Sequence, residues 1–245
     1  MSHAALFLCA GSGTRMRGTV HDKVLTLLNG KAVVLHSLDA FHRAGIIDQI
    51  TIVYRDEAQK ENLSDVFAQA QCPYPLNWVK GGTERQDSVF NALNEMSLLV
   101  EFVYIHDCAR PLVHPEALQS LRQTVMQDKA AVLAHRVTDT IKKASTKRST
   151  RKRRLRDVPR AGLWAMETPQ AFERELIVEA YRRLRLDNLS VTDDTAAVGY
   201  QQVGVSLVEN HWPNPKLTVP GDLDYLEFLL NKRKRTPDEP LKASP

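Results

Sequence analysis

The sequence predicts an α/β fold in which helices cover both faces of a mostly parallel sheet. Short apolar segments alternate with segments of helical periodicity through the first 134 residues. Glycine-rich or polar motifs directly follow several of the apolar segments. Because consecutive parallel strands need a crossover connection, usually a helix, this alternation favours a twisted parallel sheet that is buried on both sides.

Each element of this first half follows from a local pattern. Ala4–Cys9 is apolar and leads into a glycine loop, which predicts a strand. Apolar residues recur at helical spacing over 33–44, and Gly45 is a stop signal. By the same patterns we expect strands at 49–54, 76–79, 102–106 and 130–134, and helices at 57–70, 84–96 and 115–126. Ligands of such sheets bind beyond the carboxyl ends of the strands, so the loops after these strands are the expected site.

The alternation breaks between Thr138 and Arg160, where apolar residues are few and no period holds. A compact domain rarely carries so long a structureless loop, so this segment is either a disordered insertion or an excursion with its own structure. Beyond it we expect a helix at 172–184, strands at 203–208 and 216–219, and a helix at 221–230. Residues 1–230 are thus expected to form one domain, followed by a flexible tail at 231–245.

Composition places the chain among globular proteins. Hydrophobic residues are 43% of its 245 residues and charged residues 25%, both ordinary values. The longest apolar run, Ala4–Ala10, is far shorter than the about 20 residues that a membrane span requires. Three cysteines without a CxxC pair form no disulfide framework, and the start lacks the features of a signal peptide. We therefore expect a cytoplasmic protein.

The positive charge is concentrated in one segment. Residues 142–160 contain ten Lys or Arg and one acid, Asp157, for a net charge of +9, although the whole chain carries only +4. The rest of the chain is therefore acidic, with a net charge of −5. This segment could bind nucleic acid through phosphates, but it has no interleaved aromatic residues for base stacking, and the simpler alternative is a solvated loop.

A glycine loop with cations follows the first strand. Gly11 and Gly13 let the backbone approach a phosphate closely, and Arg15, Arg17 and Lys23 add positive charge. The loop lacks the Gly-Lys-Ser/Thr of a P-loop and the third glycine of a dinucleotide motif. A tight turn with exposed arginines is the alternative interpretation, which the clustered cations make less favoured.

Two further loops carry candidate chemistry. Gly81-Gly82 precede a predicted helix and expose backbone groups suited to a base edge, although a capping box with Thr83 and Gln86 is the plainer interpretation. Asp107 ends a strand where it can hold Mg²⁺, and Arg110 can bind phosphate; a surface Asp–Arg pair is the alternative. The Asp193-Asp194 pair would either bind a metal or favour a helix N-terminus.

Taken together, these motifs resemble one family, the 2-C-methyl-D-erythritol 4-phosphate cytidylyltransferases of the non-mevalonate isoprenoid pathway. The matching residues run in order from about Ala4 to Leu230. They are Ala10–Met16 with Lys23, Gly81–Val89, His106–Pro111, Thr138–Lys142, Arg160 with Gly162-Leu163-Trp164, Thr168–Gln170, Thr192–Asp194 and Asn214–Thr218. The resemblance implies a Rossmann-like nucleotidyltransferase fold with a protruding β-arm at 138–160 that hooks onto a second subunit of a homodimer.

The resemblance also implies how CTP is held. The implied nucleotide-binding residues are Ala10, Gly11, Ser12, Gly13, Gly82, Asp87, Ser88 and Asp107. Gly82 and Ser88 are expected to read the cytosine, and Asp107 to support the ribose and hold Mg²⁺. Arg15 and Lys23 are expected to be catalytic, because with the glycine-loop amides they hold the triphosphate.

The acceptor, 2-C-methyl-D-erythritol 4-phosphate, is implied to bind Arg110, Thr168 and the catalytic Lys216 of one subunit. Thr140 and Arg160 are implied to reach it from the arm of the other subunit. The residue types suit this reaction. The nucleophile is already a phosphate oxyanion, so no base is needed, and catalysis depends on positioning and on neutralising charge.

The sequence departs from the family pattern at a few positions. Asp22 stands next to Lys23, where the family usually has proline, and an acid there could weaken or reorient the lysine. Cys9 and Cys108 are milder changes. The nearest rival function is a cytidylyltransferase of the same fold that acts on ribitol 5-phosphate. A more remote one is a nucleic-acid-binding protein that uses the basic segment.

Overall fold

The computed structural model describes residues 1–11, 13, 22–145 and 152–235. Its strands are β1 (Ser2–Leu8), β2 (Leu27–Leu28), β3 (Lys31–Ala32), β4 (Gln49–Tyr54), β5 (Leu76–Lys80), β6 (Val100–Asp107), β7 (Ala130–Arg136), β8 (Lys142–Ala144), β9 (Leu155–Asp157), β10 (Trp164–Glu173) and β11 (Ser206–Glu209). Its α-helices are α1 (Val33–Ala44), α2 (Glu57–Gln69), α3 (Arg85–Glu95), α4 (Pro115–Asp128), α5 (Arg174–Leu186), α6 (Asp194–Tyr200) and α7 (Asp222–Arg235).

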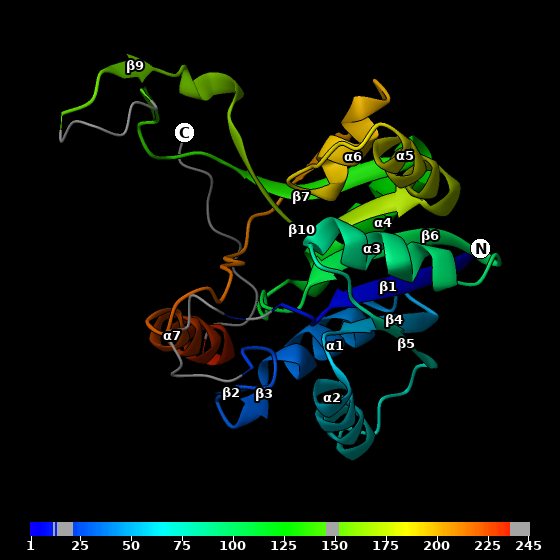
Figure 1. The fold of residues 1–245 in the computed structure, drawn as a ribbon. Coiled ribbons are helices and arrows are strands. Elements are labelled where there is room, and N and C mark those ends of the chain that lie inside the picture. The colour runs from blue at the N-terminus through cyan, green and yellow to red at the C-terminus, as the bar shows by residue number, and fades with distance from the viewer. Residues whose placement is uncertain (12, 14–21, 146–151, 236–245) are drawn as a thin grey trace.

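The described residues form a central seven-stranded sheet in the order β11-β7-β10-β6-β1-β4-β5 (Figure 1). Strand β1 pairs in parallel with both β4 and β6, and β5 and β11 also run parallel to their neighbours. Among the seven strands described in this sheet, β10 is the one that runs antiparallel to its neighbours, β6 and β7. The prediction of a mostly parallel sheet is therefore confirmed.

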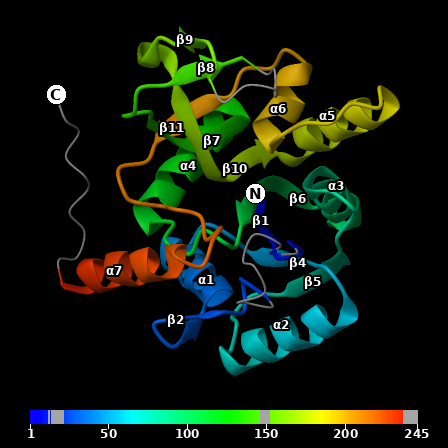
Figure 2. The ribbon, with the colours of Figure 1, turned by 60° about the vertical axis from the view of Figure 1, so that its left-hand side comes forward.

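Helices cover both faces of the sheet (Figure 2). One core cluster joins the strands to α1, α2 and α4, and a second joins them to α3, α5 and α6. Phe7 of β1 belongs to the first cluster and Leu6 to the second, and both are fully buried. Side chains of a strand alternate between faces, so a strand buried on both faces must be apolar throughout, as β1 is.

The predicted elements of the first half are confirmed with small changes at their ends. Helix α1 spans the predicted residues and ends at Gly45, whose positive φ of 62° suits a glycine C-cap. The capping box of α3 is displaced by one residue from the predicted Thr83 and Gln86. Glu84 is the N-cap and Asp87 is the third helical residue.

The second half corrects three predictions. The helix predicted at 172–184 begins only at Arg174, because Phe172 belongs to the unpredicted strand β10. Residues 216–219 are not a strand; a hydrogen bond from Leu217 N to Ala109 O (2.7 Å) and the full burial of Leu217 fix them instead. Helix α7 runs to Arg235, so residues 231–235, which we expected in a flexible tail, are helical, and 236–245 lie outside the described residues.

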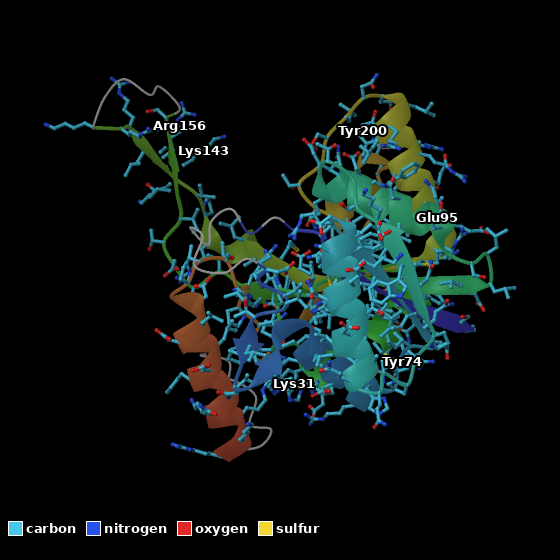
Figure 3. All side chains as sticks on the ribbon, turned by 60° about the horizontal axis from the view of Figure 1, so that its bottom comes forward. Lys31, Tyr74, Glu95, Lys143, Arg156 and Tyr200 are labelled. Atoms are coloured by element: carbon cyan, nitrogen blue, oxygen red, sulfur yellow. The ribbon has the colours of Figure 1, made fainter. Side chains whose placement is uncertain are left out.

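The segment 138–160 is described at 138–145 and 152–160, and these parts contain two short strands. Strands β8 and β9 pair antiparallel, with Lys143 opposite Arg156, and all of their residues are exposed. The pair projects away from the sheet, and Figure 3 shows Lys143 and Arg156 well apart from the body. The described parts of this segment therefore agree with an excursion that has its own structure.

Candidate active site

A cavity of about 460 Å³ opens at the carboxyl ends of β1, β4, β5 and β6, the edge where the sequence predicts the site. The loops that follow these strands meet there because the strands are parallel and end at the same edge of the sheet. The cavity is lined by Leu8, Ala10, Gly11, Lys23, Arg55, Gly82, Thr83, Glu84, Arg85, Ser88, Asp107, Ala109 and Lys216. It therefore gathers motifs that lie up to two hundred residues apart in the chain.

The two glycines after β5 are required by close contacts. A Cβ atom on Gly81 would lie 2.8 Å from Ala10 Cβ, and one on Gly82 would lie 2.3 Å from Asp87 Cβ. Gly82 N also donates to Ser88 Oγ (3.0 Å), and this hydroxyl donates to Glu84 O (3.1 Å). These contacts hold the backbone of the Gly81-Gly82 loop against the first turn of α3, on one wall of the cavity.

Asp107, the last residue of β6, is one of two carboxylates that line this cavity, and Glu84 is the other. Arg85 Nε donates to its Oδ1 (3.3 Å), and Lys216 Nζ donates to its Oδ2. Burial alone would raise the pKa of Asp107, but the charges of Arg85 and Lys216 outweigh it and hold this pKa far below its usual range. Asp107 is therefore ionised at neutral pH.

The Asp107 backbone is fixed from behind the cavity. Its amide donates to Thr168 Oγ1 (3.1 Å), which also contacts His106 Nδ1 (3.2 Å). Complete burial lowers the pKa of His106 to about 3, so the ring is neutral. Its Nε2 lies 3.1 Å from Ser37 Oγ. Thr168 thus holds Asp107 in place with its hydroxyl.

Arg85 is held by a second, fully buried carboxylate. Asp194 accepts from Arg85 Nη1 (3.0 Å) and Nη2 (2.7 Å), and from the hydroxyl of Tyr181 (2.6 Å). The bidentate pair joins α3 to α6, and the hydrogen bond from Tyr181 adds α5. These contacts fix the guanidinium that contacts Asp107. Of the two alternatives for Asp193-Asp194, the helix N-terminus is the one seen, since Asp193 caps α6 through Ala196 N.

The side chain of Lys23 lies next to Gly11 of the glycine loop. A Cβ atom on Gly11 would lie 3.5 Å from Lys23 Cε and 3.7 Å from Nζ, so the ammonium group lies beside this glycine. The neighbouring Asp22 is engaged elsewhere, because Val24 N (3.1 Å), Arg55 Nη1 (3.5 Å) and the Gln59 amide donate to its carboxylate. Burial raises the pKa of Asp22.

The sequence profile of the 2-C-methyl-D-erythritol 4-phosphate cytidylyltransferase family matches residues 4–232. Two curated relatives of that name are each 36% identical to the chain. The one from Shouchella clausii aligns over 96% of this chain and 99% of its own length. The one from Caldanaerobacter subterraneus aligns over 95% and 100%.

The chain belongs to this family. The predicted activity, cytidylyl transfer between CTP and 2-C-methyl-D-erythritol 4-phosphate in isoprenoid precursor synthesis, is thereby confirmed, and the ribitol 5-phosphate and nucleic-acid alternatives are not favoured.

Solved structures confirm the fold of this cytidylyltransferase. The crystal structure of 2-C-methyl-D-erythritol 4-phosphate cytidylyltransferase from Thermus thermophilus superposes with a TM-score of 0.74 at 26% identity, over 94% of this chain and all of that one. That of 4-diphosphocytidyl-2C-methyl-D-erythritol synthase from Anaerococcus prevotii superposes with a TM-score of 0.81 at 24% identity, over 94% and 98%. In the described part of the chain, no helix has the length and apolarity needed to span a membrane.

Seven of the fifteen expected site residues line the cavity, namely Ala10, Gly11, Lys23, Gly82, Ser88, Asp107 and Lys216. Ser12 and Arg15 lie outside the described residues, and Gly13 is described with a positive φ of 60°. Asp87 is not among the described residues that line the cavity; it caps α3 at Glu84 N (3.1 Å) and contacts Arg185 Nη2 (3.3 Å).

The arm residues Thr140 and Arg160 are exposed and are also not among the described residues lining this cavity. Arg110 is mostly buried beside it, and Arg110 Nη1 donates to Asn214 O (2.7 Å). Burial lowers the pKa of Arg110.

Sequence reasoning missed the roles of Arg85 and Asp194. Arg85 lies inside the Gly81–Ser88 motif, yet no role was assigned to it, and its partner lies 109 residues away. The acidic pair at 193–194 was the available signal, but nothing in a single sequence pairs it with Arg85.

Proposed function

We propose that cytidylyl transfer takes place in the cavity around Asp107. The observation that carries this proposal is the convergence of four basic side chains, Lys23, Arg55, Arg85 and Lys216, with the ionised Asp107 between two glycine-rich loops. The reaction brings together a triphosphate and a phosphate monoester, so a site with several fixed cations suits it.

In this proposal CTP lies along the glycine loop. The amides of residues 10–13, together with Arg15 and Lys23, hold its triphosphate. Gly82 and Ser88 face the cytosine, and Asp107 supports the ribose. Asp87 contributes indirectly, because its contact with Gly82 keeps the loop before α3 in position.

The acceptor phosphate lies between Arg110 and Lys216. Arg110 Nε is buried and has no hydrogen-bond partner among the described residues, so this donor suits a phosphate oxygen. Thr168 supports this half through Asp107. We further propose that the enzyme is a cytoplasmic homodimer in which Thr140 and Arg160 of each arm complete the partner's acceptor site.

An oxyanion of the acceptor phosphate attacks the α-phosphorus of CTP in line with the departing pyrophosphate. The P–O bond to pyrophosphate breaks as the new P–O bond forms, and no proton has to be removed from the nucleophile. Lys216 and Arg110 orient the attacking phosphate. Lys23 and Arg15 neutralise charge that builds up on the leaving pyrophosphate. Positioning and electrostatic stabilisation therefore supply the catalysis.

We propose Mg²⁺ as the metal of this reaction. Asp107 fits this role because it is ionised, lies on the cavity wall and has lone pairs beyond those that Arg85 and Lys216 occupy. Among the described residues no three His, Cys, Asp or Glu side chains gather as a metal site, so substrate phosphates and water must provide the other ligands. When bound, Mg²⁺ supplies charge neutralisation at the phosphates.

Pyrophosphate release tests the proposal. The purified enzyme is assayed with Mg²⁺ and CTP in two separate reactions. One contains 2-C-methyl-D-erythritol 4-phosphate as the acceptor, and the other contains ribitol 5-phosphate. We expect release with the first acceptor, and an about 10²–10³-fold loss of turnover in both Lys23→Ala and Lys216→Ala, with the folded state retained at the assay temperature. Release with ribitol 5-phosphate alone would overturn the acceptor assignment, and near-normal turnover in both variants would overturn the placement of the site.

A further inference from the structure

One buried carboxylate near the site has no role in the mechanism above. Glu167 lies in β10, where the register with β7 shifts between Met166 and Gln170. Its side chain is 3% exposed. Bulges of this kind redirect side chains and occur often beside active sites. A buried carboxyl group needs several hydrogen-bond partners to offset its desolvation, and Glu167 has them.

Three donors surround the Glu167 carboxylate. His135 Nδ1 lies 2.6 Å from Oε1, and the side-chain amides of Asn210 and Asn214 each donate to Oε2 at 2.8 Å. His135 belongs to β7, whereas the asparagines belong to the segment 210–216. Glu167 therefore connects two strands of the sheet to a segment that has no helix or strand of its own.

That segment contains Lys216 and contacts Arg110, the two residues to which we assign the acceptor phosphate. The Asn214 side chain donates to Thr168 O as well (3.1 Å), and Asn214 O accepts from Arg110 Nη1 (2.7 Å). Lys216 follows two residues later and contacts Asp107. Glu167 thus fixes Asn214, which accepts the hydrogen bond from Arg110 and lies two residues before Lys216.

Charge provides a second link between Glu167 and this half of the site. Burial lowers the pKa of Arg110, and the Glu167 carboxylate opposes this more strongly than Asp107 does. Glu167 is therefore the main counter-charge to the buried Arg110, although the structure describes no direct ion pair between the two side chains.

We propose that Glu167 is a positioning residue for the acceptor half of the site. It holds Asn214 in place, and through Asn214 it sets Arg110 and Lys216 at the spacing that a sugar phosphate requires. This inference rests on the proposed assignment of Arg110 and Lys216 to 2-C-methyl-D-erythritol 4-phosphate. The CTP half of the site has no comparable contact with Glu167 among the described residues, so the effect is confined to the acceptor.

Two substitutions separate positioning from general destabilisation. Glu167→Gln keeps an oxygen for the two asparagine amides, and its new amide group can donate to the other tautomer of His135. Glu167→Ala removes every acceptor. Glu173→Ala is the matched control, because Glu173 lies in the same strand and forms a half-exposed ion pair with Lys129 (3.1 Å) away from the cavity.

The test is the KM of each substrate, measured with the other one saturating. In Glu167→Ala we expect the KM for 2-C-methyl-D-erythritol 4-phosphate to rise about tenfold or more while the KM for CTP changes by less than about twofold. Glu167→Gln should restore most of the acceptor affinity, and Glu173→Ala should resemble the wild type. Equal increases in both KM values, or no increase in either, would overturn the proposal.

Two further variants test the role of Glu167 and the acceptor-site assignment separately. Asn214→Ala removes the link to Glu167 but leaves the carboxylate its other two donors, so it should reproduce the same KM split even if Glu167→Ala folds poorly. Arg110→Met tests the underlying assignment. If it leaves the acceptor KM unchanged, the proposed acceptor site is wrong; if it raises that KM while Asn214→Ala does not, only the role of Glu167 is wrong.

Discussion

The buried pair between Arg85 and Asp194 gives a prediction whose size follows from the structure. Asp194 is fully buried and accepts two hydrogen bonds from the guanidinium of Arg85 and one from Tyr181. We consider the substitution Asp194→Ala. It leaves the guanidinium with one of its three hydrogen bonds to carboxylates and leaves a buried hydroxyl without its acceptor.

The expected loss of stability can be worked from these contacts. Breaking a buried ion pair by removing one partner costs about 3–5 kcal/mol, and an unpaired buried hydroxyl costs about 1–3 kcal/mol. Arg85 is 30% exposed and keeps Asp107 as a second partner, so water and that carboxylate recover part of the cost. We therefore expect the free energy of unfolding to fall by about 3 kcal/mol, the lower end of the range for buried pairs.

Equilibrium unfolding in urea, at pH 7 and equal protein concentration, measures this loss. Asp187→Ala is the matched control, because Asp187 also accepts from a tyrosine, Tyr200 (2.7 Å), but lies at the surface. It should change stability by less than about 0.5 kcal/mol. A loss below about 1 kcal/mol in Asp194→Ala, or equal losses in both variants, would refute the reasoning from burial.

Three other predictions concern single positions. Gly82→Ala places a Cβ atom 2.3 Å from Asp87 Cβ, so we expect the KM for CTP to rise about tenfold or more, and an unchanged value would contradict this. Thr168→Val removes the acceptor of the Asp107 amide and should lower stability to urea by about 1–3 kcal/mol, whereas Thr168→Ser should not; equal stabilities would be inconsistent with that bond. Burial lowers the pKa of His36, so below about pH 6.5 the unfolded chain binds a proton that the folded chain does not. The free energy of unfolding therefore decreases as the pH decreases. His36→Gln should therefore lose less stability than the wild type between about pH 7 and pH 5, and parallel losses would exclude this contribution.

Local patterns predicted the parallel half of the sheet because each of its elements is set by its own sequence. Strand β4 coincides with the predicted residues, and α1 ends at the glycine that predicted its end. Strand β10 was missed for a physical reason. It buries Glu167, Thr168 and Gln170 through specific hydrogen bonds, so it lacks the apolar or alternating pattern by which strands are identified.

The site was predictable to the same extent. Loops at the ends of parallel strands must converge, so the sequence located the cavity and placed Lys23 and Asp107 near it, whereas Lys216 was expected only from the family resemblance. It did not predict which side chains hold those groups in place. Asp194 and Glu167 act through partners that are distant in the chain, and no local pattern predicts such pairings.

The position of β10 also governs the order in which the sheet is assembled during synthesis. A nascent chain that has emerged only to Gly162 already contains β1, β4, β5 and β6, yet β7 has no neighbour to pair with, because β10 must lie between it and β6. Until β10 leaves the ribosome, β6 presents an open edge that other chains can join. Closing this edge requires long-range pairing, which is slow. During the delay before β10 docks, the open edge of β6 therefore favours aggregation of the newborn enzyme.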